Sequence, residues 1–133
     1  MKRYGTVIIV ASLAGCVTLD PATVSTKSTP QVCYSWAVAR VGNSDNTTAA
    51  TAYDELLRRQ AFSKRDLDMI RSHGRPMPGM TEGAAICAWG GSYDTVNTTT
   101  TASGTTRQFI ERFETGYTRY FYTRNGIVTA VQD

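Results

Sequence analysis

The sequence predicts an α+β domain in which short helices pack on one face of a small antiparallel β-sheet that ends in an Asn-Gly hairpin. Three observations lead to this prediction. Apolar residues recur at helical spacing between positions 32 and 89, β-branched and aromatic residues dominate from Tyr93 onward, and Asn125-Gly126 separates the last two strand-like segments. Asn-Gly between such segments is a strong hairpin signal. The 133 residues suffice for one domain of this kind.

The first residues have the pattern of a bacterial lipoprotein signal peptide. Lys2 and Arg3 precede a mostly apolar stretch, residues 4–14, which is shorter than the about 20 residues that a membrane-spanning helix needs. The stretch leads into Leu-Ala-Gly-Cys, which ends at Cys16 and resembles a lipobox. This resemblance implies cleavage after Gly15 and acylation of the Cys16 thiol. An ordinary secretory signal with an incidental Cys16 is the alternative.

The residue after the cysteine is Val17 rather than Asp. By resemblance to lipoprotein sorting in Gram-negative bacteria, this residue favours the outer membrane over the inner one, with the domain facing the periplasm. Residues 17–30 are rich in Thr, Ser and Pro and lack periodicity, which is typical of a flexible tether. Such a tether reaches roughly 20 Å. The expected division is a signal peptide (1–15), a lipidated cysteine with its tether (16–30), and one domain built from a helical segment (31–74) and a helix-plus-sheet segment (75–133).

Helical spacing predicts several short helices before the sheet. A turn cluster at residues 42–46 ends the first of them. Glu55 and Arg59, four residues apart in the second, can form an ion pair. Ser63 is expected to cap the third helix and Thr81 the fourth, which is short and rich in alanine. The predicted spans are about 31–40, 48–61, 64–73 and 82–89.

The C-terminal part predicts four strands joined by short turns. In the last hairpin a two-residue loop pairs Arg124 with Ile127 and Tyr122 with Thr129. Both faces of this hairpin carry apolar side chains. One face is expected to pack against the helices, and the other to present an aromatic surface away from them. The predicted strands are 93–101, 105–113, 117–124 and 127–132.

An ordered series of short motifs runs through the C-terminal half of the chain. It comprises Gly79-Met80-Thr81, Ala88-Trp89-Gly90, Val96-Asn97, Gly104, Tyr120-Phe121-Tyr122 and residues 125–132. Over about residues 75–133 the series resembles the SmpA/OmlA (BamE-like) family of outer-membrane lipoproteins, with Ser92 at a position where that family usually has proline. The resemblance implies two helices on an antiparallel sheet and a role in binding, without identifying the partner.

The expected function is therefore that of a non-catalytic binding or scaffold module in cell-envelope maintenance, including outer-membrane protein assembly. A periplasmic hydrolase inhibitor is the alternative, and a cell-wall enzyme is less favoured. The partners expected are the membrane, through Cys16, and an unidentified envelope protein. The net charge of +3, part of it in the leader, argues against a nucleic-acid partner.

Enzymatic motifs are absent from the sequence. It contains no Walker loop, no Gly-x-Ser-x-Gly elbow and no Cys-x-x-Cys. A triad of Ser63, His73 and Asp68 can be written down but lacks that elbow. With a single histidine, no metal site and no cofactor are expected.

Cys33 and Cys87 remain once Cys16 is acylated. In an oxidising periplasm an even pair favours a disulfide, which here would close a span of 54 residues. Two buried free thiols are the alternative.

Arginine and tyrosine residues occur close together in the third predicted strand. Arg119, Tyr120, Tyr122 and Arg124 are a candidate interface patch, because Tyr and Arg are favoured anchors at protein interfaces. A solvated sheet face with arginine stems lying over the rings is the alternative.

Overall fold

A computed structural model describes residues 18–41 and 46–133 of the chain. In these residues the fold is α+β, as predicted, with short helices followed by a four-stranded antiparallel sheet of order β1-β2-β3-β4. Cys16 and all but the last residue of the 42–46 turn cluster lie outside the described residues. The elements are η1 (Val24–Thr26), α1 (Thr29–Val41), α2 (Asn46–Arg58), α3 (Lys64–His73), α4 (Glu82–Ala88), β1 (Thr95–Thr101), β2 (Gly104–Arg112), β3 (Thr118–Arg124) and β4 (Ile127–Gln132).

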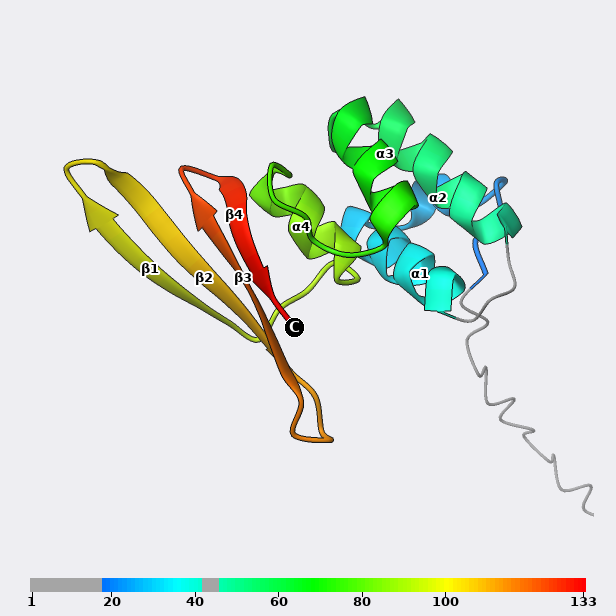
Figure 1. Ribbon diagram of the computed structural model, residues 1–133. Helices are drawn as coiled ribbons and strands as arrows, with labels where there is room; N and C mark the ends of the chain where they lie inside the picture. Colours follow the sequence, from blue (N-terminus) through cyan, green and yellow to red (C-terminus); the bar gives the residue numbers. More distant parts are fainter. Residues whose placement is uncertain (1–17, 42–45) are drawn as a thin grey trace, which may run out of the picture.

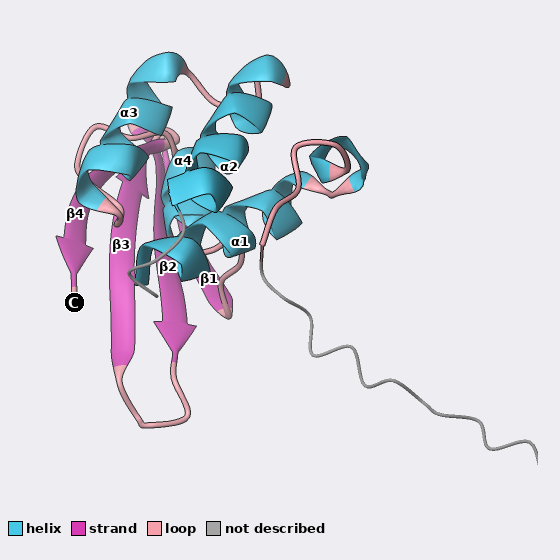
Figure 2. Cartoon of the chain, turned by 90° about the vertical axis from the view of Figure 1, so that its right-hand side faces the viewer, coloured by secondary structure: helices cyan, strands magenta, loops and turns pink. Residues whose placement is uncertain are grey.

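The helices lie on one side of the sheet, with α4 nearest to it and α1, α2 and α3 beyond (Figures 1 and 2). The interior between the layers is aromatic. Trp89, directly after α4, meets Phe121 of β3 with ring centroids 4.6 Å apart, and Phe121 stacks on Phe109 of β2 at 4.7 Å. All three rings are at most 5% exposed. Aromatic burial therefore joins the helical layer to the sheet.

Asp66 connects the N-termini of two helices. Ser63 caps α3 as predicted, because its Oγ accepts a hydrogen bond from the backbone N–H of Asp66 at 3.0 Å. Thr81 occupies the N-cap position of α4 but makes no side-chain cap. Its hydroxyl donates instead to Asp66 Oδ2 at 2.6 Å. Asp66 is 1% exposed, so this bond fixes the start of α4 against α3.

Asn125 and Gly126 connect β3 to β4, with Arg124 opposite Ile127. Their φ angles are 49° and 81°, the left-handed values that a two-residue type I′ loop requires at both positions. Glycine and asparagine adopt these values at the lowest cost, which explains why this dipeptide occupies the turn.

A β-bulge in β4 changes the pairing expected for the hairpin. Tyr122 pairs with Ala130, so the predicted pairing of Tyr122 with Thr129 is wrong by one residue. Thr129 is the extra residue, and its hydroxyl donates to the carbonyl of Tyr122 at 3.3 Å. Regular alternation would place Val128 and Val131 on opposite faces. With the bulge, both pack against the core.

A disulfide between Cys33 of α1 and Cys87 of α4 joins the outer helices to the helix nearest the sheet. The predicted pair is thus present, with Cα atoms 5.0 Å apart and each cysteine 1% exposed. It crosses a sequence separation of 54 residues. A loop of that length restricts the unfolded chain strongly.

Replacing both cysteines by alanine (C33A/C87A) should lower the free energy of unfolding by up to about 4 kcal/mol, because the unfolded chain regains the entropy of the open loop. Urea denaturation monitored by circular dichroism measures this. Wild-type protein denatured with excess reductant is the matched control and should behave like the double variant. Equal urea midpoints for oxidised wild type and the variant would contradict the prediction.

Candidate functional site

The structure shows how the chain just after the predicted lipidation site is held. Leu19 and Val24 are 6% and 5% exposed, and the backbone N–H of Leu19 donates to Thr48 Oγ1 of α2 at 3.3 Å. The expected flexible tether therefore differs from the structure over residues 18–28, which pack against the helices. Sequence reasoning missed this because two isolated apolar residues in a Thr/Ser/Pro-rich stretch show no periodicity.

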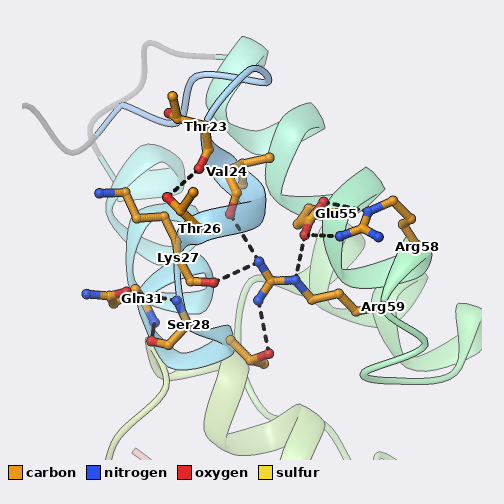
Figure 3. A network of polar contacts seen from close by, with 10 residues as sticks. Thr23, Val24, Thr26, Lys27, Ser28, Gln31, Glu55, Arg58 and Arg59 are labelled. Atoms are coloured by element: carbon orange, nitrogen blue, oxygen red, sulfur yellow. Dashed lines mark hydrogen bonds and ion pairs between the residues drawn. The ribbon is translucent and has the colours of Figure 1, made fainter.

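Arg59, just beyond the end of α2, fastens this segment (Figure 3). Its Nη2 donates to the carbonyls of Val24 at 3.0 Å and Lys27 at 2.7 Å, and its Nη1 donates to Thr29 Oγ1 at 3.3 Å. Its Nε donates to Glu55 Oε1 at 2.6 Å. One guanidinium thus satisfies backbone carbonyls before α1 while it is itself oriented by a carboxylate.

Glu55 orients Arg59 from a buried position. The side chain is 5% exposed and also accepts two hydrogen bonds from Arg58, at 2.7 and 2.9 Å. Hydrogen bonds from Arg58, and then from Arg59, lower the pKa of Glu55 from 4.5 to about 2. The predicted ion pair of Glu55 and Arg59 is therefore present. Only the tertiary structure shows that Arg59 also binds the N-terminal segment through the carbonyls of Val24 and Lys27.

The candidate interface residues of β3 do not lie together. Successive strand residues point to opposite faces of a sheet, so Arg119 is separated from the other three. It faces the helices, where its Nε donates to Glu111 Oε2 at 2.6 Å. Its guanidinium lies 4.9 Å from the Trp89 ring centroid and 5.1 Å from that of Phe113. Arg119 thus belongs to the packing between the layers and not to an outer patch.

Tyr120, Tyr122 and Arg124 share the far face of the sheet, which is turned away from the helices. Arg124 is exposed and donates to the carbonyl of Ser103 at 3.3 Å. Tyr120 pairs with Ile110 of β2 on one side and with Gln132 of β4 on the other. Both Tyr120 and Tyr122 are half-buried. These three residues therefore remain a candidate interface on geometric grounds.

A chain of side-chain hydrogen bonds crosses all four strands of the far face. Asn97 of β1 donates to Gln108 Oε1 of β2 at 3.0 Å, and Gln108 Nε2 donates to the Tyr122 hydroxyl of β3 at 3.1 Å. That hydroxyl donates to Gln132 Oε1 of β4 at 3.3 Å. We call these four residues the amide–tyrosine ladder. Sequence reasoning missed it because the register of all four strands is needed to see that these positions are neighbours.

The residues of the conceivable catalytic triad have other tasks. Ser63 and His73 lie at opposite ends of α3, and Asp68 accepts hydrogen bonds from the Tyr53 hydroxyl and from Lys64, both at 2.7 Å. Across the described part of the chain, no three His, Cys, Asp or Glu side chains are gathered so that they could hold a metal ion. No described helix has the length and apolar character needed to cross a bilayer.

Comparison with known proteins finds no matching family model, no matching curated protein and no matching solved structure. The resemblance to the SmpA/OmlA family is therefore carried by the sequence motifs alone. Function has to be inferred from the residues of this chain and from their geometry.

Glu55→Gln should destabilise the protein, because Arg58 and Arg59 lose the carboxylate that holds them. The pKa of Glu55 is lower in the folded state, so its contribution is complete above pH 4.5 and disappears as the pH falls toward 2. Urea denaturation at several pH values should show a deficit for the variant at pH 7 that shrinks below pH 4.5.

Asp54→Asn provides the matched control, because Asp54 is the neighbouring carboxylate and is exposed. This variant should keep the stability of the wild type throughout the pH range. A deficit of Glu55→Gln that stays constant between pH 7 and pH 2.5 would show that charge on Glu55 is not what stabilises the segment.

Proposed function

We propose that the chain is an outer-membrane lipoprotein whose domain faces the periplasm and acts as a non-catalytic binding or scaffold module in cell-envelope maintenance. Outer-membrane protein assembly is the process that the resemblance to the SmpA/OmlA family favours. The observation that carries the proposal is the basic, apolar leader that ends in Leu-Ala-Gly-Cys at Cys16. The disulfide between Cys33 and Cys87 supports it, because such bonds persist in oxidising compartments.

The packing of residues 18–28 implies a domain held close to its anchor. Leu19 is buried and lies three residues after Cys16 in the sequence. An extended residue spans at most about 3.6 Å, so no more than about 11 Å of chain would separate an acylated Cys16 from Leu19. A partner in or on the same membrane would then meet the domain at a high effective concentration.

The far face of the sheet is the surface proposed for the envelope partner. Tyr120, Tyr122 and Arg124 provide aromatic area, hydroxyl groups and one exposed guanidinium. The amide–tyrosine ladder already orders Tyr122, so binding there costs less conformational entropy than binding to a free side chain. Arg119 is not part of this surface.

Cys16→Ala should release the protein from membranes, because the variant lacks the thiol that would carry the lipid. Cell fractionation with immunoblotting measures the distribution. Val17→Asp is the matched control, since it keeps the cysteine and should move the protein to the inner membrane. If Cys16→Ala still sediments with membranes, lipid on Cys16 is not the anchor.

Tyr120→Ala combined with Arg124→Ala should reduce the yield of a crosslinked envelope partner at least about tenfold, as expected when two interface anchors are removed. Crosslinking in intact membranes, followed by mass spectrometry, measures this yield. Arg65→Ala, which removes an exposed arginine from α3, should leave the yield unchanged. An unchanged partner set in the double variant would exclude the far face, and a hydrolase as partner would favour the inhibitor alternative.

A further inference from the structure

A cleft of about 820 Å³ lies at the C-terminal ends of α1, α3 and α4, beside β2 and β3. It is on the helical side of the sheet, so it is separate from the far face. Much of its wall is apolar or aromatic. These wall residues are Tyr34, Ala37, Val38, Val41, Trp89 and Phe113.

Arg40, in the last turn of α1, is the unusual member of this lining. Its Nη2 donates to the carbonyl of Ala88 at 3.0 Å, and its guanidinium carbon lies 5.1 Å from the Trp36 ring centroid. Its Nη1 is buried and has no hydrogen-bond partner in the described part of the chain. Burial lowers the pKa of Arg40 to about 10, so the side chain still carries its charge at neutral pH.

Among the residues that the structure describes, no carboxylate forms an ion pair with Arg40. Among the described arginines, each of the others either forms an ion pair or is exposed to solvent. Within the cleft, Arg119 pairs with Glu111 and Arg71 pairs with Asp68. Arg40 therefore contributes one uncompensated positive charge to a partly buried site, an arrangement that costs free energy until an anion is bound.

A second unsatisfied donor belongs to the same lining. Trp89 is 5% exposed, and its indole N–H has no hydrogen-bond partner within the described residues. Three buried side-chain polar atoms of the described residues lack a partner, and the third, on Asp66, does not belong to this cleft. Both unsatisfied atoms of cleft-lining residues are thus donors, which calls for a ligand that accepts hydrogen bonds.

We infer that this cleft binds a carboxylate carried on an apolar body, with Arg40 as its counter-charge. A carboxylate matches the single uncompensated guanidinium in charge and accepts its planar fork of donors. The apolar body is accommodated by the walls of the cleft. Because Nη1 is buried in the unliganded chain, binding requires the Arg40 stem to turn so that Nη1 reaches the anion. Both a free organic acid and the C-terminal residue of a polypeptide have this chemistry. The inference is independent of the function proposed above.

The test uses the full chain in non-ionic detergent and 3-phenylpropionate as the probe. The chain has two tryptophans, so their two indole N–H signals in nuclear magnetic resonance can be followed separately. The signal of Trp89, which lines the cleft, should shift in a saturable way. The neutral isostere 3-phenylpropionamide should bind at least about tenfold more weakly, because it lacks the charge. A short peptide that ends in phenylalanine, with its C-terminus either as a free carboxylate or as an amide, distinguishes a polypeptide C-terminus from a free organic acid as the source of the carboxylate.

Variants connect the binding to Arg40. Arg40→Gln should weaken 3-phenylpropionate binding at least about tenfold, and Arg40→Lys should fall between it and wild type, because lysine keeps the charge without the fork. Arg65→Gln is the matched control, since Arg65 is exposed and forms no ion pair with any carboxylate of the described residues, and it should bind as wild type does.

Three results would overturn the inference: no saturable shift of Trp89, equal affinity for acid and amide, or wild-type affinity in folded Arg40→Gln. If Arg40→Gln does not fold, the comparison of acid and amide on wild type still decides. None of these results affects the test of Cys16 or that of the far face, so the two proposals fail separately.

Discussion

The disulfide between Cys33 and Cys87 is the constraint on which the rest of the molecule depends, because it holds a helix too short to be stable alone. α4 has seven residues, fewer than the about 12 that an isolated helix needs even for marginal stability. It is fixed through Cys87 to α1, through Thr81 to Asp66 of α3, and through the adjoining Trp89 to Phe121 of the sheet. α4 and the residues that flank it join the helical layer to the sheet.

The sheet divides the molecule into two surfaces of different chemistry. On the helical side, cationic and aromatic side chains interleave, as in the contact of Arg119 with Trp89. No carboxylate within residues 18–41 and 46–133 forms an ion pair with Arg40 there. On the far side, amides and a tyrosine satisfy one another across four strands. A partly buried charge favours an anionic ligand, whereas a satisfied and ordered polar face favours a protein surface. The two binding proposals follow from this difference.

Residues 18–28 are attached to the helices by buried side chains and hydrogen bonds. Arg59 donates hydrogen bonds to the carbonyls of Val24 and Lys27, and the carboxylate of Glu55 orients the Arg59 guanidinium. A lipid on Cys16 would therefore be connected to the helices by a few residues and not by a long coil. Such an anchor, if present as proposed, would restrict how far the domain moves from the bilayer and would favour contact with a partner embedded there.

By itself the sequence determined what depends on local pattern: the fold class, the Ser63 cap and the Asn125-Gly126 turn. It also favoured the pairing of Cys33 with Cys87, which the structure contains. Each of these follows from neighbouring residues or from simple counting. The tertiary structure alone decided the bulge at Thr129, the amide–tyrosine ladder and the exposure of Arg40 to a cleft. These features depend on strand register and on contacts between residues distant in sequence, and no local pattern encodes such contacts.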